Sequence, residues 1–160
     1  MAIARYHLKI KKGDKVLVAL PTTTKDAGHN SWTLPNDLDS SDETPSEVVR
    51  KIFAKLSGGV DLNDVLIQNT LEYSHRVDDD GKVDYRTEII LSPKNDIEFS
   101  MVNSDLMRYD KTSELRIPKY VKYKWVPESE LYYWLTRSCC RLENIRVSYF
   151  YPDNVRPVSR

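Results

Sequence analysis

A single amphipathic helix with marked ends is the feature that most limits how this chain can fold. Thr44 can cap the helix, Pro45 suits its first position, and Glu47 stands where a capping box places an acidic residue. Gly58 and the glycine after it can end the helix. Between these signals, apolar side chains recur at helical spacing on one stripe, namely Val48, Val49, Ile52, Phe53 and Leu56. A helix over residues 45–57 with one apolar face needs a sheet or a second helix to cover it.

Alternating apolar and polar residues on both sides of this helix predict strands that can cover it. The first two should form a hairpin over residues 4–20, and Asp78-Asp79-Asp80-Gly81 is a turn signal between the next two. In chain order the predicted strands are Arg5–Ile10, Lys15–Leu20, residues 65–77, residues 83–91, Tyr120–Trp125 and Val147–Tyr151.

The remaining segments are predicted as one more main helix and connecting loops. The helix is expected over about residues 127–142, and a short helix is expected near Ser104–Tyr109. Residues 21–31 and 36–41 are polar, so they are predicted to be loops. The order of elements predicts an α+β or α/β fold in which two main helices sandwich a mixed sheet, within a single domain over residues 1–160.

Composition and charge exclude several classes of function for the chain as a whole. The formal net charge is zero, from 24 basic and 24 acidic side chains, so no global attraction to nucleic acid or anionic membrane is expected. The apolar runs of the sequence are too short to span a membrane. Cys139 and Cys140 are adjacent, and a disulfide between neighbouring residues is strained. We therefore expect a soluble protein of a reducing, cytoplasmic compartment, without a cofactor.

Two motifs of the chain resemble those of the Nudix superfamily. Trp32-Thr33-Leu34-Pro35 resembles the W-x-L-P-G-G segment that leads into the family signature, G-x5-E-x7-R-E-U-x-E-E-x-G-U, where U is aliphatic. Laid on the predicted helix, the signature puts its first glutamate on Glu43, its arginine on Lys51 and its last glycine on Gly58. The segment Trp125-Val126-Pro127-Glu128-Ser129-Glu130-Leu131 is similar to the W-V-x-x-x-E-L segment that begins the family's last helix. Over about residues 4–140 the resemblance implies a Nudix-like α/β/α sandwich, with Glu43 and Gly58 as structural positions and Glu43 paired with Lys51.

The resemblance breaks at the residues that would carry chemistry. The three glutamates with which the family holds divalent metals fall on Ile52, Lys55 and Leu56. Mg²⁺ prefers hard oxygen ligands, and none of these side chains supplies one. We therefore expect no metal site on this helix, and a degenerate signature of this kind is typical of a pseudoenzyme.

Three functions remain open from the sequence. The first is a non-catalytic Nudix-fold module that binds a nucleotide, RNA or a protein partner. The second is a divergent metal-dependent hydrolase of nucleoside-diphosphate-linked substrates, whose relocated ligands would be Glu43, Glu47 and Glu88. The third is a structural subunit of a larger complex, with an interface formed by Tyr132, Tyr133 and Trp134. The oligomeric state is left open.

Candidate ligand-binding residues lie on the helix and on the second hairpin. Lys51 and Lys55, one turn apart, would meet a phosphate or an acidic partner, or else form a solvated face that pairs with Glu47. Three hairpin residues would stack on a base or else pack across the strands, namely Tyr73, His75 and Tyr85. Trp32, in front of the signature, completes this set.

Two further groups have a functional and a simpler interpretation. Residues 116–124 interleave basic and aromatic side chains, which suits a nucleic-acid surface but also an edge strand protected by lysines. The loop carboxylates would form an alternative metal site or serve turn formation and solubility, namely Asp37, Asp39, Asp42 and Asp78 to Asp80. The simpler interpretation is favoured in both cases.

Overall fold

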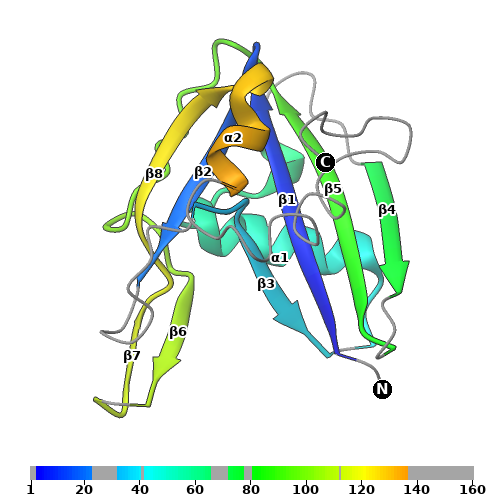
Figure 1. Ribbon diagram of the computed structural model, residues 1–160, viewed down its shortest axis with the longest axis vertical. Helices are drawn as coiled ribbons and strands as arrows, with labels where there is room; N and C mark the ends of the chain where they lie inside the picture. The colour runs from blue at the N-terminus through cyan, green and yellow to red at the C-terminus, as the bar shows by residue number, and fades with distance from the viewer. Residues whose placement is uncertain are drawn as a thin grey trace.

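The computed structural model describes residues 3–22, 32–40, 42–65, 72–77, 81–111 and 113–136. Its main body is a six-stranded sheet with a helix on each face, and a two-stranded hairpin projects from one side (Figure 1). The elements are β1 (Ala4–Lys12), β2 (Lys15–Pro21), β3 (Asn36–Asp39), α1 (Pro45–Ser57), η1 (Leu62–Asp64), β4 (Glu72–Val77), β5 (Val83–Leu91), β6 (Met107–Asp110), β7 (Leu115–Pro118), β8 (Tyr120–Pro127), η2 (Glu128–Glu130) and α2 (Leu131–Thr136).

Strand β1 organises the sheet, because it pairs with three other strands. The order is β4-β5-β1-β2-β8, with β1 parallel to β5 and the other neighbours antiparallel. The paired residues of β1 and β2 lie next to their hairpin turn, and beyond them β2 separates from β1. β3 occupies the space that opens and pairs with the first half of β1, from Ala4 opposite Asp39 to His7 opposite Asn36. The sheet is therefore mixed, as predicted.

Helix α1 covers one face of the sheet with the apolar stripe predicted from the sequence. Alternate residues of β1 meet this stripe in the larger core, whose fully buried members include Leu8, Ile10, Phe53, Leu56 and Ile89. Thr44 accepts a hydrogen bond from the backbone N–H of Glu47, and Pro45 is the first helical residue. Gly58 adopts a φ of 81°, and a Cβ there would lie 2.4 Å from the backbone oxygen of Asn103. The predicted bounds and caps of this helix are confirmed.

A smaller core lies on the opposite face, under α2. It joins Val16 and Val18 of β2 and Val126 of β8 to Leu131 and Leu135 of the helix, and Leu34 belongs to the same cluster. Trp32 and Trp134 border it, with ring centroids 5.7 Å apart in an edge-to-face arrangement. On the same side of the sheet, β1 and β5 carry charged residues in place of apolar ones.

Two predictions of local structure are wrong. The loop expected over residues 36–41 contains β3, because Asn36–Asp39 is drawn into a strand by its pairing with β1. The short helix expected near Ser104–Tyr109 is absent, since Met107–Asp110 pairs with Leu115–Pro118 in the β6–β7 hairpin. In both segments a partner distant in the sequence decides the backbone conformation.

Two longer predictions are confirmed in part and are otherwise untested. Of the strand expected over residues 65–77, Glu72–Val77 forms β4, and residues 66–71 lie outside the described residues. The helix expected over residues 127–142 begins as the 3₁₀ helix η2 and continues as α2. The rest of that helix and three other predictions lie outside the described residues, namely the turn at 78–80, the loop at 23–31 and the strand at 147–151. No helix within the described ranges is long and apolar enough to cross a membrane.

Candidate functional site

The helix positions that the Nudix signature reserves for metal ligands are part of the core or are tied to a loop. Ile52 is 4% exposed and Leu56 is 0% exposed, and both pack in the larger core. Lys55 is exposed, and its backbone oxygen accepts hydrogen bonds from the N–H of Asp105 at 2.7 Å and from the hydroxyl of Ser104 at 3.3 Å. These three positions offer no carboxylate oxygen to a metal.

The ion pair expected between Glu43 and Lys51 is present at the start of α1. The Lys51 ammonium donates to a Glu43 carboxylate oxygen and lies 3.9 Å from Asp39. The hydrogen bond to Glu43 is the main cause that raises the pKa of Lys51. Because the side chains of Lys51 and Glu43 are 49% and 35% exposed, the pair is worth about 0.2–1 kcal/mol. The ammonium is therefore shared between carboxylates of the preceding segment.

The acidic residues considered as relocated metal ligands are not brought together. Glu43 takes part in the ion pair above, whereas Glu47 receives a hydrogen bond from the Thr44 hydroxyl at 3.1 Å within the capping box. Glu88 lies on the opposite face of the sheet, 3.7 Å from a lysine of β1. Among the residues that the structure describes, no group of three or more His, Cys, Asp or Glu side chains could hold a metal ion.

Two aromatic rings of the β4–β5 hairpin, those of His75 and Tyr85, share the α1 side of the sheet. Tyr73 is opposite Thr87 and His75 is opposite Tyr85, in the register that their alternation predicts. The ring of Tyr85 stacks on Tyr6 of β1, with centroids 4.8 Å apart and planes 10° from parallel. The exposed His75 ring lies 6.0 Å from Tyr85, and the side chain of Tyr73 is outside the described part. Tyr85 therefore packs across strands, and base stacking by this group stays a prediction.

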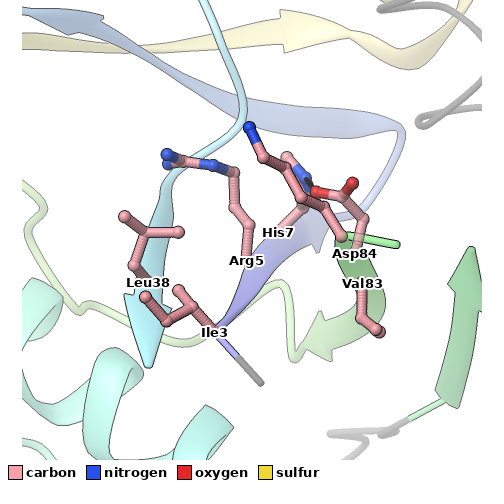
Figure 2. Close-up of a pocket in the computed structure, with 7 residues that line it drawn as sticks. Ile3, Arg5, His7, Leu38, Val83 and Asp84 are labelled. Carbon is pink, nitrogen blue, oxygen red and sulfur yellow. Dashed lines mark hydrogen bonds and ion pairs between the residues drawn. The ribbon is translucent and has the colours of Figure 1, made fainter. Parts of the chain in front are cut away.

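A cavity of about 460 Å³ lies on the sheet face opposite α1, over the first residues of β1 (Figure 2). Alternation along β1 turns Arg5 and His7 to this face, away from the core residue Tyr6. β3 places Leu38 opposite Arg5, and the parallel pairing with β5 places Asp84 on its other side. Figure 2 shows Arg5 reaching toward β3, while His7 and Asp84 lie side by side. The lining residues are Ile3, Arg5, His7, Leu38, Lys82, Val83 and Asp84.

The cavity contains a buried histidine–aspartate pair. His7 Nε2 lies 2.9 Å from Asp84 Oδ1, and the two side chains are 6% and 12% exposed. Burial lowers the pKa of His7, because it disfavours the charged imidazolium. Asp84 opposes this shift, whereas the positive charges of Arg5 and Lys119 add to it. His7 is therefore neutral at pH 7, and the charged lining residues are two cations, Arg5 and Lys82, and one anion, Asp84.

Asn36, at the start of β3, is held by hydrogen bonds that also position Arg5. Arg5 Nη1 donates to Asn36 Oδ1 at 2.5 Å. The Tyr120 hydroxyl accepts from the Asn36 N–H at 2.9 Å and donates to the Asn36 carbonyl at 3.1 Å. Lys119 donates to the same carbonyl and lies 3.2 Å from Asp37. Burial lowers the pKa of Lys119, and the negative charge of Asp37 opposes that shift. The wall of the cavity at β3 is thus fixed from β8.

The ligand residues chosen from the sequence and the cavity do not coincide. Lys51 and Lys55 belong to α1, and Trp32 borders the smaller core. Of the expected interface, Trp134 packs against Trp32 and Tyr133 is 54% exposed. Sequence reasoning does not single out the lining residues, although one signal points to them. Polar or charged residues alternate with the core residues of β1, namely Arg5, His7, Lys9 and Lys11.

No family model matches the chain, and no curated protein matches it in sequence. Solved structures do match its fold. The Ap4A hydrolase of C. elegans, in a binary complex, has a TM-score of 0.54 at 11% identity, with coverage of 91% of this chain and 95% of that one. A NUDIX hydrolase from Nitrosomonas europaea has a TM-score of 0.51 at 13% identity, with coverage of 98% and 97%.

A third match is the bifunctional NMN adenylyltransferase/ADP ribose pyrophosphatase from Francisella tularensis, complexed with AMP and a Mn ion. Its TM-score is 0.53 at 11% identity, with coverage of 79% of this chain. The chain spans 34% of the length of that protein. These likenesses show a Nudix-like fold, and they confirm the mixed sheet with flanking helices predicted from the sequence.

Proposed function

We propose that this chain, with its Nudix-like fold, is a non-catalytic module that binds a small phosphate-bearing ligand, such as a nucleotide, in the cavity over β1, β3 and β5. The guanidinium of Arg5 carries the proposal. Arg5 lines the cavity and donates to the neutral amide oxygen of Asn36, while Asp84 is already engaged by His7. An anion entering the cavity would therefore meet the Arg5 guanidinium in a partly desolvated setting, where electrostatic attraction is strong.

The size and the remaining lining of the cavity suit such a ligand. Small-molecule sites commonly measure about 300–1,000 Å³ and are mostly apolar with a few placed polar groups. Ile3, Leu38 and Val83 supply the apolar part here. Arg5 supplies a planar guanidinium, which can bind two phosphate oxygens at once.

The non-catalytic part of the proposal rests on the residues of α1. A metal that bridges a diphosphate neutralises developing charge and activates water. The positions that the signature assigns to its ligands are Ile52, Lys55 and Leu56, of which the first and last are buried in the core. A carboxylate cannot be supplied there by a change of rotamer.

Similar structures support the class of ligand. One of them is complexed with AMP and a Mn ion, and another is an Ap4A hydrolase. AMP, and the Ap4A after which the second protein is named, are both nucleotides that carry phosphate. Those proteins are named as hydrolases or pyrophosphatases, and this chain departs from them, in our proposal, by retaining binding without turnover.

We also place the module in a reducing compartment such as the cytoplasm. Cys139 and Cys140 are the two cysteines of the chain, and their adjacency disfavours a disulfide between them. Alkylation of protein purified without reductant should therefore label both thiols.

Binding of AMP, ADP-ribose and inorganic phosphate, measured by calorimetry, tests the ligand site. We expect Arg5→Gln and Lys82→Gln each to weaken nucleotide binding by about tenfold, because each removes a charged partner of the phosphate. Lys94→Gln is the matched control, since Lys94 is an exposed lysine that does not line this cavity. Equal affinities for all three variants, or no binding of any of these ligands, would contradict the proposal.

Hydrolysis assays test the non-catalytic part separately. With Mg²⁺ or Mn²⁺ we expect no turnover of ADP-ribose or Ap4A above the rate without protein. Turnover that disappears in Glu47→Gln would contradict this expectation and favour the divergent hydrolase with relocated ligands.

A further inference from the structure

We propose that the outer edge of β8 binds an extended acidic segment of a partner protein, which adds to the main sheet as a new strand. This inference is independent of the ligand cavity. In the sheet order β4-β5-β1-β2-β8, β8 stands last and pairs with β2 along one side. Within the part of the chain that the structure describes, no strand pairs with its other side. An unpaired edge of this kind is a template for strand addition.

The register shows which backbone groups face outward. Ala19 of β2 exchanges hydrogen bonds with Thr33, at 2.8 and 2.9 Å, so its backbone groups point away from β8. Successive residues of a strand point their backbone groups to opposite sides, so the neighbours of Ala19 bond to β8 at Lys122 and Lys124. The outward N–H and C=O groups in the regular part of β8 are therefore those of Tyr123 and Trp125, because the register shifts at Val121.

The side chains of β8 specify the chemistry of the added strand. Lys122 and Lys124 are exposed on one face, and the Lys124 ammonium lies 4.5 Å from the ring centroid of Trp134. Val121 is 36% exposed at the register shift, and the half-buried Tyr123 and Trp125 alternate with the two lysines on the other face. A second copy of this edge would place lysine near lysine, which disfavours self-association. A partner that alternates acidic and apolar residues would instead match both faces.

The neighbouring hairpin continues the same flank of the molecule. β7 is followed after one residue by β8, and the β6–β7 hairpin projects beyond the main sheet (Figure 1). Tyr109 and Leu115 of this hairpin are 54% and 62% exposed. A segment longer than β8 would therefore find apolar contacts beyond the end of the main sheet.

The structure favours a peptide over a nucleic acid at this strand. Base stacking needs exposed aromatic faces, but Tyr120 is 2% exposed and Trp125 packs edge-to-face on Phe99 at 6.0 Å. Tyr123 is half-buried and contacts Tyr120, with ring centroids 5.9 Å apart. Lys119 is held by Asp37. Within residues 116–124, the β8 edge therefore presents two lysines and a row of backbone groups.

A synthetic peptide of the same length as β8, with Glu and Val in alternation, tests the proposal. Its control has the same composition with all Glu residues at one end. We expect the alternating peptide to bind at least about tenfold more tightly in a fluorescence anisotropy titration, and Lys122→Glu with Lys124→Glu to reverse that gain. The double variant Lys55→Glu with Lys94→Glu carries the same change of charge away from β8 and should bind as the wild type does.

Amide hydrogen exchange followed by NMR gives the decisive pattern. On binding, the amides of Tyr123 and Trp125 should slow, whereas those of Lys122 and Lys124, already bonded to β2, should not change. Equal binding of the two peptides, no slowing of the two outward amides, or tighter binding of single-stranded RNA that depends on Lys122 and Lys124 would each overturn the proposal.

Discussion

The two faces of strand β1 differ in chemistry: one is apolar and the other is charged. Toward α1 it places Tyr6, Leu8 and Ile10, which are buried among apolar neighbours. On the other side it places Arg5 and His7 at the cavity and lysines farther along. On the apolar face, core side chains fill the region in which the Nudix signature would hold a metal. The charged face leaves room for a ligand, so the site and the helix of the signature lie on opposite sides of the sheet.

The charged face itself differs along its length. Lys9, with a side chain 13% exposed, lies 2.9 Å from Glu128 and 3.7 Å from Glu88, and Lys11 lies 3.0 Å from Glu128. Burial alone would raise the pKa of Glu128, but its pairing with both lysines outweighs burial and lowers it. At this end the lysines pair with carboxylates, whereas at the other end Arg5 donates to the neutral amide oxygen of Asn36. In our proposal, this difference makes the Arg5 end the ligand site.

The largest effect is expected from restoring a carboxylate on the buried side of α1. We expect Leu56→Glu to lower the free energy of unfolding by at least about 3 kcal/mol, because it removes core packing and buries a charge. Lys55→Glu, on the adjacent exposed position, should cost less than about 1 kcal/mol. Urea denaturation measures both changes. A Leu56→Glu protein with wild-type stability and Mn²⁺ affinity would show that this face is an open site.

The wall of the cavity is expected to depend on one buried hydroxyl. Tyr120→Phe should lower the free energy of unfolding by about 1–3 kcal/mol, because it leaves the backbone N–H of the buried Asn36 without the hydroxyl that accepts from it. Tyr109→Phe, at an exposed position of the β6–β7 hairpin, is the control and should change stability little. Equal effects in thermal or urea unfolding would mean that Tyr120 acts by packing alone.

On the apolar face, one buried hydroxyl should be unfavourable. Thr87 is 0% exposed, and its Oγ1 has no hydrogen-bond partner in the described structure. Thr87→Val should therefore raise the free energy of unfolding by up to about 1 kcal/mol, since no hydrogen bond is lost. The same replacement at the helix cap, Thr44→Val, should lower it by about 1 kcal/mol. A loss of stability in Thr87→Val would reveal a partner for this hydroxyl.

The smallest expected effect is the pH dependence of the charged face. The pKa of His7 is lowered by burial from its ordinary value of 6.5, so the unfolded chain takes up this proton first. The contribution of His7 to stability is present above pH 6.5 and is lost as the pH falls from 6.5 toward the lowered pKa. Between pH 7.5 and 5.5, wild-type protein should thus lose more stability in urea denaturation than His7→Gln does. Parallel curves would show that His7 has an ordinary pKa in the fold.

Several local features can be predicted from the sequence because their causes lie within a few residues. The start of α1 follows from Thr44 and Pro45, and its end follows from Gly58. The errors arise where a distant partner decides the conformation. Residues 36–41 look like a polar loop until β1 offers Asn36–Asp39 a strand to pair with. Tyr85, a candidate for base stacking, is covered on one face by Tyr6, from a strand that no local pattern links to it.

The candidate site shows the same division. Residue identity is enough to establish that Ile52, Lys55 and Leu56 carry no carboxylate and that charged residues alternate along β1. The parallel pairing of β1 with β5 is a feature of the folded chain, and it brings His7 to within 2.9 Å of Asp84, 77 positions away in the chain. Alternation fixes which side of a strand a residue faces. The partner that it meets there depends on strand register, which is set by the packing of the whole sheet.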